Sequence, residues 1–371
     1  MSDVIVIGGG VIGLSIAYEL AGEGAAVTLL EKGEIGKEAS WAGAGMLPPG
    51  NPQKATTPMM RLQAESHLLW EGLTKELFES TGVDNGYRLS GCLEVLHGNE
   101  RYWNKQLAMW QREWGLVEEL TTEELHDFEP ALSPKIKKGF RLSAQGQARN
   151  PRHLHALRIG CAQRGVRLIS GKPVIGFKTE GGAISTVITE NQTFTAKKYC
   201  ICNGAWATSL LTNSGAGGKV KPIRGQIVQL QAEQLPFTHI IEVGARYLVP
   251  RPDGRILIGS TEEDVGFQKQ NTSEGIAGLL DFATELIPQL STAQFIRAWS
   301  GLRPRTEDAL PYIGAIPHIK NLYVATGHFR NGLQMSPGTA KLMRQIILEQ
   351  SLFMDIAPFS ISRHQNKVST L

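Results

Sequence analysis

Three glycines and one acidic residue near the start of the chain have the spacing needed to hold a dinucleotide. Gly8, Gly10 and Gly13 follow an apolar run, and Glu31 lies 18 residues beyond the last of them. Gly8 allows a tight turn, Gly10 lets a pyrophosphate approach the backbone, and Gly13 lets a helix pack closely on the strand. The helix N-terminus then directs amide N–H groups and a partial positive charge at the phosphates. Glu31 is placed to accept hydrogen bonds from both ribose hydroxyls.

The residues around these glycines decide whether the pattern is informative. Residues 4–7 form a continuous apolar run, which is typical of a strand buried on both faces. Ile12, Ile16 and Leu20 recur at helical spacing. The sequence therefore predicts a strand, a glycine turn, a helix and a second strand. The alternative is a glycine-rich turn in an α/β protein of another kind.

Two arginines lie in an unusual block at residues 299–308. Arg303, between an apolar stretch and a proline, is suited to bind a planar carboxylate through two parallel hydrogen bonds. For Arg305 a surface ion pair with Glu307 or Asp308 is the better interpretation. Tyr247 begins a predicted strand, and its hydroxyl is available to bind the same carboxylate; simple core packing is the rival interpretation.

A glycine-flanked loop at residues 327–333 precedes the last long helix, which the sequence predicts over residues 337–349. Such loops at strand ends bring backbone N–H groups to ligands. A helix N-terminus there would stabilise the negative charge of a reduced flavin. Arg330 is predicted to add a positive charge near substrate or flavin, with a structural contact as the alternative, and His328 is predicted to fix the loop rather than to act as a base.

The segment at residues 44–46 is rich in small residues, which would permit backbone contact with a flavin ring, with Met46 near the substrate. A flexible loop is the alternative. No Ser-His-Asp, paired-carboxylate or metal-ligand pattern is evident in the sequence. That fits amine oxidation by hydride transfer to flavin N5, because the cofactor carries the difficult step and the protein aligns the substrate.

The order of predicted elements indicates a Rossmann-like FAD-binding domain interleaved with an antiparallel-sheet substrate domain, an α/β (α+β) fold. This layout favours a flavin enzyme over a simple nicotinamide dehydrogenase. The predicted FAD-binding segments are residues 1–85, 151–219 and 299–371. The predicted substrate-domain segments are residues 86–150 and 220–298, the first containing a strand at residues 87–96.

The composition suits a globular enzyme of about two domains: the chain has 371 residues, 42% hydrophobic and 20% charged. A net charge of +3 is too small to indicate nucleic-acid binding, and no apolar run approaches the roughly 20 residues of a membrane span. The first predicted strand begins within three residues of Met1, so no signal or transit peptide is expected. The four cysteines are predicted to be reduced thiols, with Cys200 and Cys202 on one strand face, and the location to be the cytoplasm.

These motifs together resemble the glycine oxidases of the thiamine-biosynthesis type, in the D-amino acid oxidase and sarcosine oxidase superfamily. The resemblance covers nearly the whole chain and rests on the opening glycine motif and on segments 42–47, 224–226, 247–251, 258–262, 301–304 and 327–332. It implies non-covalent FAD, oxidation of glycine to glyoxylate, ammonia and hydrogen peroxide, and supply of an imino acid for thiazole formation. It also implies a homo-oligomer, expected to be a tetramer, with thiazole synthase as a candidate partner.

The resemblance also implies roles for individual residues. Arg303 would bind the substrate carboxylate, assisted by Tyr247, with Arg330 and Met46 at the substrate site. Residues expected to contact FAD, including those of the glycine motif, are Gly8, Gly10, Val11, Ile12, Gly13, Glu31, Lys32, Ala39, Ser40, Ala44, Gly45, Met46, Val174, Gly204, His328, Phe329, Arg330, Asn331, Gly332, Leu333 and Gln334.

The chain departs from some of these relatives at two places. Ala39-Ser40 replaces a Thr-Thr pair, which removes one hydroxyl near the cofactor, and Glu262 replaces a methionine. The covalently flavinylated relatives have a cysteine near the position of Arg303, and none is present here. Two other functions remain open: a D-amino acid dehydrogenase that uses an acceptor other than oxygen, and a non-catalytic flavin-containing subunit.

Overall fold

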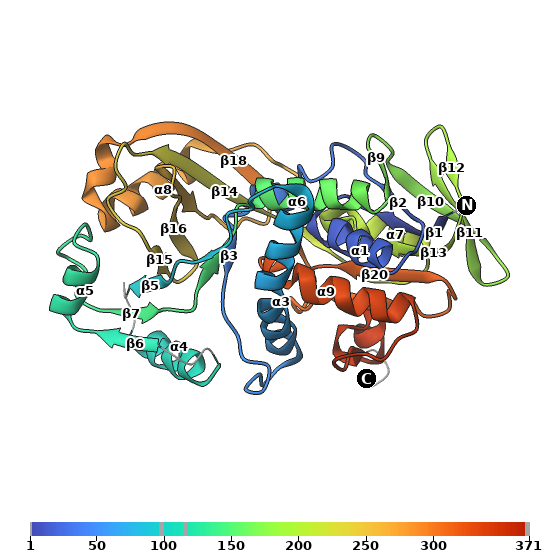
Figure 1. The fold of residues 1–371 in the computed structure, drawn as a ribbon, viewed down its shortest axis with the longest axis horizontal. Coiled ribbons are helices and arrows are strands. Elements are labelled where there is room, and N and C mark those ends of the chain that lie inside the picture. Colours follow the sequence, from blue (N-terminus) through green and yellow to red (C-terminus); the bar gives the residue numbers. More distant parts are fainter. Residues whose placement is uncertain (1, 96–99, 114–116, 368–371) are drawn as a thin grey trace.

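A computed structural model describes residues 2–95, 100–113 and 117–367, with backbone only at 100–105, 113 and 365–367. The molecule is elongated, with one sheet near each end and the helix α3 between them (Figure 1). None of the described helices combines the length and apolar character needed to cross a membrane.

The first sheet has the order β19-β20-β13-β1-β2-β9 and is parallel except for β19. Its strands are β1 (Ser2–Ile7), β2 (Val27–Leu30), β9 (Arg167–Ile169), β13 (Ala196–Ile201), β19 (Tyr312–Ala315) and β20 (Leu322–Thr326). Both faces of β1 are buried, because Val4 and Val6 pack into one core cluster and Ile5 and Ile7 into another. The continuous apolar run predicted such a strand.

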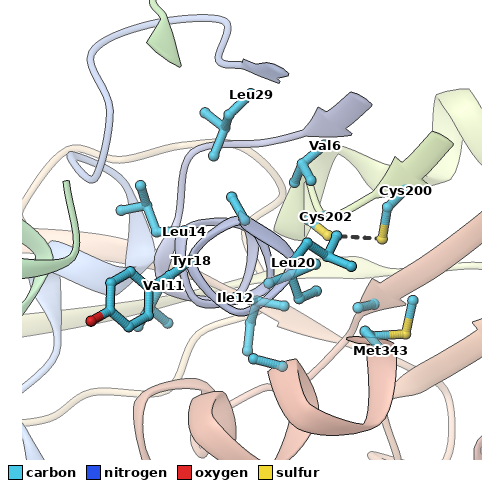
Figure 2. Packing of buried hydrophobic residues seen from close by; sticks show 14 of the residues in the cluster. Val6, Val11, Ile12, Leu14, Tyr18, Leu20, Leu29, Cys200, Cys202 and Met343 are labelled. Carbon is cyan, nitrogen blue, oxygen red and sulfur yellow. Dashed lines mark hydrogen bonds between the residues drawn. The ribbon is translucent and has the colours of Figure 1, made fainter. Parts of the chain in front are cut away.

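Helices cover one face of this sheet, and a small sheet with a short helix covers the other. The first set is α1 (Val11–Gly22), α3 (Pro58–Thr81), α6 (Asn150–Gln163) and α9 (Gly332–Ile347), which share one core cluster. The second set is β10 (Val174–Glu180), β11 (Ala183–Thr189), β12 (Thr193–Phe194) and α7 (Ala207–Asn213). Figure 2 shows α1 packed among Val6, Leu29 and Met343, with the thiols of Cys200 and Cys202 3.4 Å apart. All four cysteines are free and buried.

The second sheet has eight strands in the order β18-β14-β17-β16-β15-β5-β7-β6, and all neighbours are antiparallel except β15 and β5. The strands are β5 (Cys92–Val95), β6 (Val117–Leu120), β7 (Gly139–Leu142), β14 (Lys221–Gln231), β15 (Ile240–Val243), β16 (Arg246–Pro250), β17 (Arg255–Gly259) and β18 (Gln294–Arg305). Helices α5 (Thr122–Phe128) and α8 (Ser273–Leu286) pack on it.

The remaining elements are short or peripheral. They are α2 (Ala39–Ala42), α4 (Glu100–Glu113), the three-stranded sheet of β3 (Met46–Leu47), β8 (Gly146–Gln147) and β4 (Arg88–Leu89), and the 3₁₀ helices η1 (Gly204–Trp206), η2 (Pro288–Thr292), η3 (Ala357–Phe359) and η4 (Ile361–Lys367).

The predicted fold class is confirmed, and the two sheets alternate along the chain as expected. The predicted boundary between residues 298 and 299 falls inside β18, which pairs with β14 along its length. The division of the chain at the proposed residues stays a prediction.

Two predicted elements were wrong in their bounds. The strand expected over residues 87–96 is divided, up to residue 95, into β4 and β5, because Gly91 between them has φ of +67°; residue 96 lies outside the described residues. Helix α9 begins at Gly332 rather than at Pro337. Proline lacks the N–H that would bond the Leu333 carbonyl, but the Ser336 hydroxyl donates to that carbonyl at 2.8 Å. The helix therefore continues through the proline.

Candidate functional site

A cavity of about 420 Å³ is lined by residues of both sheets. Its volume is within the range of small-molecule and cofactor sites. Of the predicted site residues, those lining it are Gly8, Gly10, Val11, Ile12, Glu31, Lys32, Ala39, Ser40, Ala44, Gly45, Met46, Val174, Gly204, Tyr247, Arg303, His328, Phe329, Arg330, Asn331, Gly332 and Leu333. Gly13 and Gln334 are not part of this lining.

The glycine turn at the end of β1 leaves no room for side chains. Gly8 has φ of +115°, and a Cβ there would lie 2.5 Å from the Cys202 carbonyl oxygen. A Cβ on Gly13 would lie 1.9 Å from the Gly8 carbonyl oxygen, so Gly13 serves the packing of α1 on the turn rather than the cavity surface. At Gly10 the nearest atom to a Cβ is the Ser40 hydroxyl, 3.1 Å away.

Glu31 follows β2, and its carboxylate is held by the backbone on both sides. It accepts hydrogen bonds from the Gly9 N–H at 2.7 Å and the Gly33 N–H at 3.0 Å, and it is only 7% exposed. These two bonds fix its orientation and leave further lone pairs free to accept.

Lys32 and Ser40 also have partners at the cavity wall. The Lys32 ammonium lies 3.1 Å from the centre of the Trp206 ring and 3.6 Å from Glu38, and burial lowers its pKa. The Ser40 hydroxyl accepts from the Val11 N–H at 2.9 Å, so it engages the first turn of α1.

The atoms that line the cavity themselves indicate a site for a dinucleotide. The side-chain oxygens of Asn150 and Asn203 are buried in its lining and have no hydrogen-bond partner among the described residues. Buried polar atoms are normally paired, so these two indicate a ligand or ordered water. With the N-terminus of α1 and the oriented Glu31, the residues present fit FAD.

Arg303 on β18 is fixed by two acceptors from the segment after β17. It donates to the Thr261 carbonyl at 3.0 Å and to the Ser260 hydroxyl at 2.6 Å. Burial lowers its pKa, whereas Tyr247 and Glu262 act in the opposite direction. A guanidinium has five N–H donors, so those that remain are available to a ligand.

Two glycines make room for the predicted substrate residues. A Cβ on Gly225 would lie 2.2 Å from Arg303 Nη2, so the guanidinium lies directly against the Gly225 backbone. A Cβ on Gly259 would lie 2.5 Å from the Tyr247 ring, its cross-strand neighbour. Both glycines occur in segments that carried the resemblance, but no role could be predicted for either, because the contacts join distant strands.

The other two arginines share one carboxylate. Arg330 donates to the Ala245 carbonyl at 2.9 Å, and both Arg330 and Arg305 lie 3.6 Å from Glu262. The predicted ion pair of Arg305 with Glu307 or Asp308 was therefore wrong in its partner. Strand β18 continues through Arg305, which directs the side chain toward Glu262, and Asp308 pairs with Arg363 instead.

The loop at residues 327–331 is fixed to helix α9. His328 is buried, its Nε2 lies 3.1 Å from the Thr339 hydroxyl, and burial lowers its pKa to about 3. This geometry agrees with a loop-fixing histidine. Gln334 donates to the Pro48 carbonyl at 2.8 Å. Gln334 lies in the first turn of α9 and is not part of the cavity lining, and its predicted contact with FAD stays a prediction.

The sequence prediction missed several lining residues. They are Asn150, Lys172, Pro173, Cys202, Asn203, Trp206, Ser209, Gly225, Ser260 and Thr326, among others. Asn203 and Thr326 could have been predicted from the sequence, because they lie at the carboxyl ends of parallel strands, where ligands of α/β sheets bind. Among the described residues, no group of three or more His, Cys, Asp and Glu side chains is arranged to hold a metal.

A dinucleotide cavity between a mostly parallel sheet and a mixed sheet fits a flavin-dependent oxidoreductase, and the family of the chain shows that class. The chain belongs to the FAD dependent oxidoreductase family DAO, whose model matches residues 3–346. It is an enzyme of that family, and FAD is its cofactor.

Individual relatives match nearly the whole of this chain. The glycine oxidase of Geobacillus kaustophilus is 34% identical, over 99% of this chain and 98% of its own. The crystal structure of glycine oxidase from that organism has a TM-score of 0.92 at 32% identity and covers 98% of this chain and 99% of its own. The bifunctional protein ThiO/ThiG of Nostoc sp. is 33% identical over 100% of this chain but 56% of its own length.

Proposed function

We propose that this protein is a glycine oxidase. The activity takes glycine, oxygen and water to glyoxylate, ammonia and hydrogen peroxide, with an imino acid formed first. The observation that carries the proposal is the fixed guanidinium of Arg303, beside Tyr247, in the same cavity as the dinucleotide turn. The near full-length similarity to two proteins named glycine oxidase supports it.

In this proposal the protein binds and orients the substrate, and FAD held in the cavity would supply the acceptor for the hydride of the substrate α-carbon. The remaining N–H groups of Arg303 bind the substrate carboxylate, and the Tyr247 hydroxyl adds a further bond. Two-point binding fixes the α-carbon relative to the segment at residues 44–46. We assign His328 to fixing the loop rather than to proton transfer, because its Nε2 contacts the Thr339 hydroxyl and because burial, which lowers its pKa to about 3, makes the ring a weak base.

The similarity to ThiO/ThiG proteins supports a role in thiamine synthesis. We infer that the imino acid is passed to thiazole formation, with thiazole synthase as a partner. Sarcosine and small D-amino acids are further proposed substrates. Non-covalent FAD, a homotetramer and a cytoplasmic location complete the proposal.

The decisive experiment is an anaerobic titration of the purified holoprotein with glycine, followed by admission of air. Loss of flavin absorbance and its recovery with one equivalent of peroxide is the expected result. Reduction without recovery in air would overturn the oxidase and indicate a dehydrogenase with another acceptor. If glycine, sarcosine and D-alanine all left the flavin oxidised, the glycine oxidase would be rejected, and the enzyme would act on another donor.

A further inference from the structure

An exposed segment crosses from the eight-stranded sheet to the cofactor cavity. We define residues 264–271, between β17 and α8, as the latch segment. Phe267 in its middle is 54% exposed, and its ring centre lies 5.5 Å from that of Trp206. Lys269 donates to Glu38 at 2.8 Å. Both contacted residues line the cavity.

The ends of the latch segment are anchored on buried polar residues of β14. Arg224, 5% exposed, pairs with Glu263 and donates to the Gln270 carbonyl at 2.7 Å. Gln226, fully buried, donates to Glu263 at 2.7 Å and accepts from the Thr272 N–H at 2.8 Å. The segment is therefore held at both ends, while its middle meets the other half of the molecule through exposed contacts alone.

The contacts converge on the end of the cavity where the adenosine is expected. Lys32 lies between Trp206 and Glu38, at 3.1 Å from the ring centre and 3.6 Å from the carboxylate. It directly follows Glu31, the acid placed for the ribose hydroxyls. Phe267 and Lys269 therefore contact Trp206 and Glu38, the two side chains that hold Lys32 at the cavity wall.

We propose that the latch segment is a further part of the cofactor site, which closes over the adenosine end and slows release of FAD. The exposed Lys269–Glu38 pair is weak and is screened by salt, so it suits a contact that opens and closes. The buried anchors keep the segment positioned for reclosure. This inference rests on the proposed placement of FAD but not on the identity of the substrate.

The test measures the rate of FAD release from the holoprotein after dilution, from the rise in flavin fluorescence. Lys269→Ala and Phe267→Ala should each accelerate release severalfold. Added salt should accelerate release from the unaltered protein and have a smaller effect on Lys269→Ala, because the screened pair is already gone. Lys135→Ala, which alters an exposed lysine outside the cavity lining, is the matched control.

Release of FAD at the unaltered rate from both variants would overturn the latch. So would a fall in the thermal unfolding temperature of the variant apoproteins that equals the fall in their holoproteins. The latter would show a merely structural role. Failure of the proposed function can be distinguished from failure of the latch, because the proposed function is tested by reduction of the flavin with glycine. Faster release from variants of a protein that glycine does not reduce would support the latch and reject the glycine oxidase.

Discussion

Arg303 is the residue on which substrate recognition depends in our proposal, and its surroundings give the size of the effect. Replacement by alanine removes a partly buried positive charge that would pair with the substrate carboxylate. Loss of such a pair costs about 3–5 kcal/mol. We expect Arg303→Ala to raise the half-saturating glycine concentration several hundredfold in steady-state kinetics. A near-normal value would reject the carboxylate role.

Gly225 offers a subtler test of the same guanidinium. A methyl group there would lie 2.2 Å from Arg303 Nη2, so Arg303 must move away from Ser260 and Thr261. We expect Gly225→Ala to raise the half-saturating glycine concentration about tenfold, which corresponds to roughly 1.4 kcal/mol. Gly278→Ala is the control, because a Cβ there meets nothing within 4 Å. Equal kinetics in the two variants would show that Gly225 does not position Arg303.

Glu242 makes the stability of the folded protein depend on pH. Burial raises its pKa to about 7, against the attraction of Arg330, and burial also raises the pKa of its neighbour Glu94. Because the folded protein holds this proton more tightly than the unfolded chain, the stabilisation is fully present below the ordinary pKa of 4.5 and is lost progressively as pH rises from there to about 7.

Glu242→Gln should therefore flatten the fall in free energy of unfolding between about pH 4.5 and 7, measured by urea denaturation. Glu180→Gln, at an exposed position of β10, should leave the unaltered slope. If the slope persisted in Glu242→Gln, the groups responsible would lie elsewhere.

At the scale of elements, the close packing of α3 and α9 depends on Gly338. A Cβ there would lie 2.3 Å from the Ser66 hydroxyl, which also accepts from the Gly338 N–H at 3.2 Å. We expect Gly338→Ala to lower the free energy of unfolding by about 1–3 kcal/mol through overpacking. Gly72→Ala in α3, with nothing within 4 Å, should instead stabilise by about 0.5–1 kcal/mol. Chemical denaturation of both variants tests the opposite signs.

Local pattern and long-range pairing explain which elements could be predicted. Strand β1 and helix α1 follow from their own apolar spacing and glycines, so the dinucleotide turn was readable from one short segment. The contacts of Gly225 and Gly259 depend on the register of β14 with β18 and of β16 with β17. Helix α9 continues through Pro337, and the Leu333 carbonyl accepts a hydrogen bond from the Ser336 hydroxyl there. These contacts cannot be predicted from local sequence patterns.

At the scale of the whole molecule, the cavity joins two sheets whose strands alternate along the chain. Ile7 and Thr326 reach it from the parallel sheet, and Tyr247 and Arg303 from the eight-stranded sheet. A ligand between them contacts both halves at once. Binding of FAD should therefore stabilise the two halves together rather than one alone.

Removal of FAD tests this coupling. A ligand that binds only the folded state at about 100 times its dissociation constant stabilises by about 2.7 kcal/mol. We expect the apoprotein to unfold at a lower temperature, and the temperature to rise with added FAD in one cooperative transition, followed by circular dichroism. FMN lacks the adenosine that Glu31 and Lys32 are placed to hold, so it should raise the unfolding temperature less at equal concentration. Equal effects of FMN and FAD would mean that the adenosine end contributes nothing to binding. Two separate transitions, of which FAD raises only one, would mean that the cofactor stabilises one half without coupling it to the other.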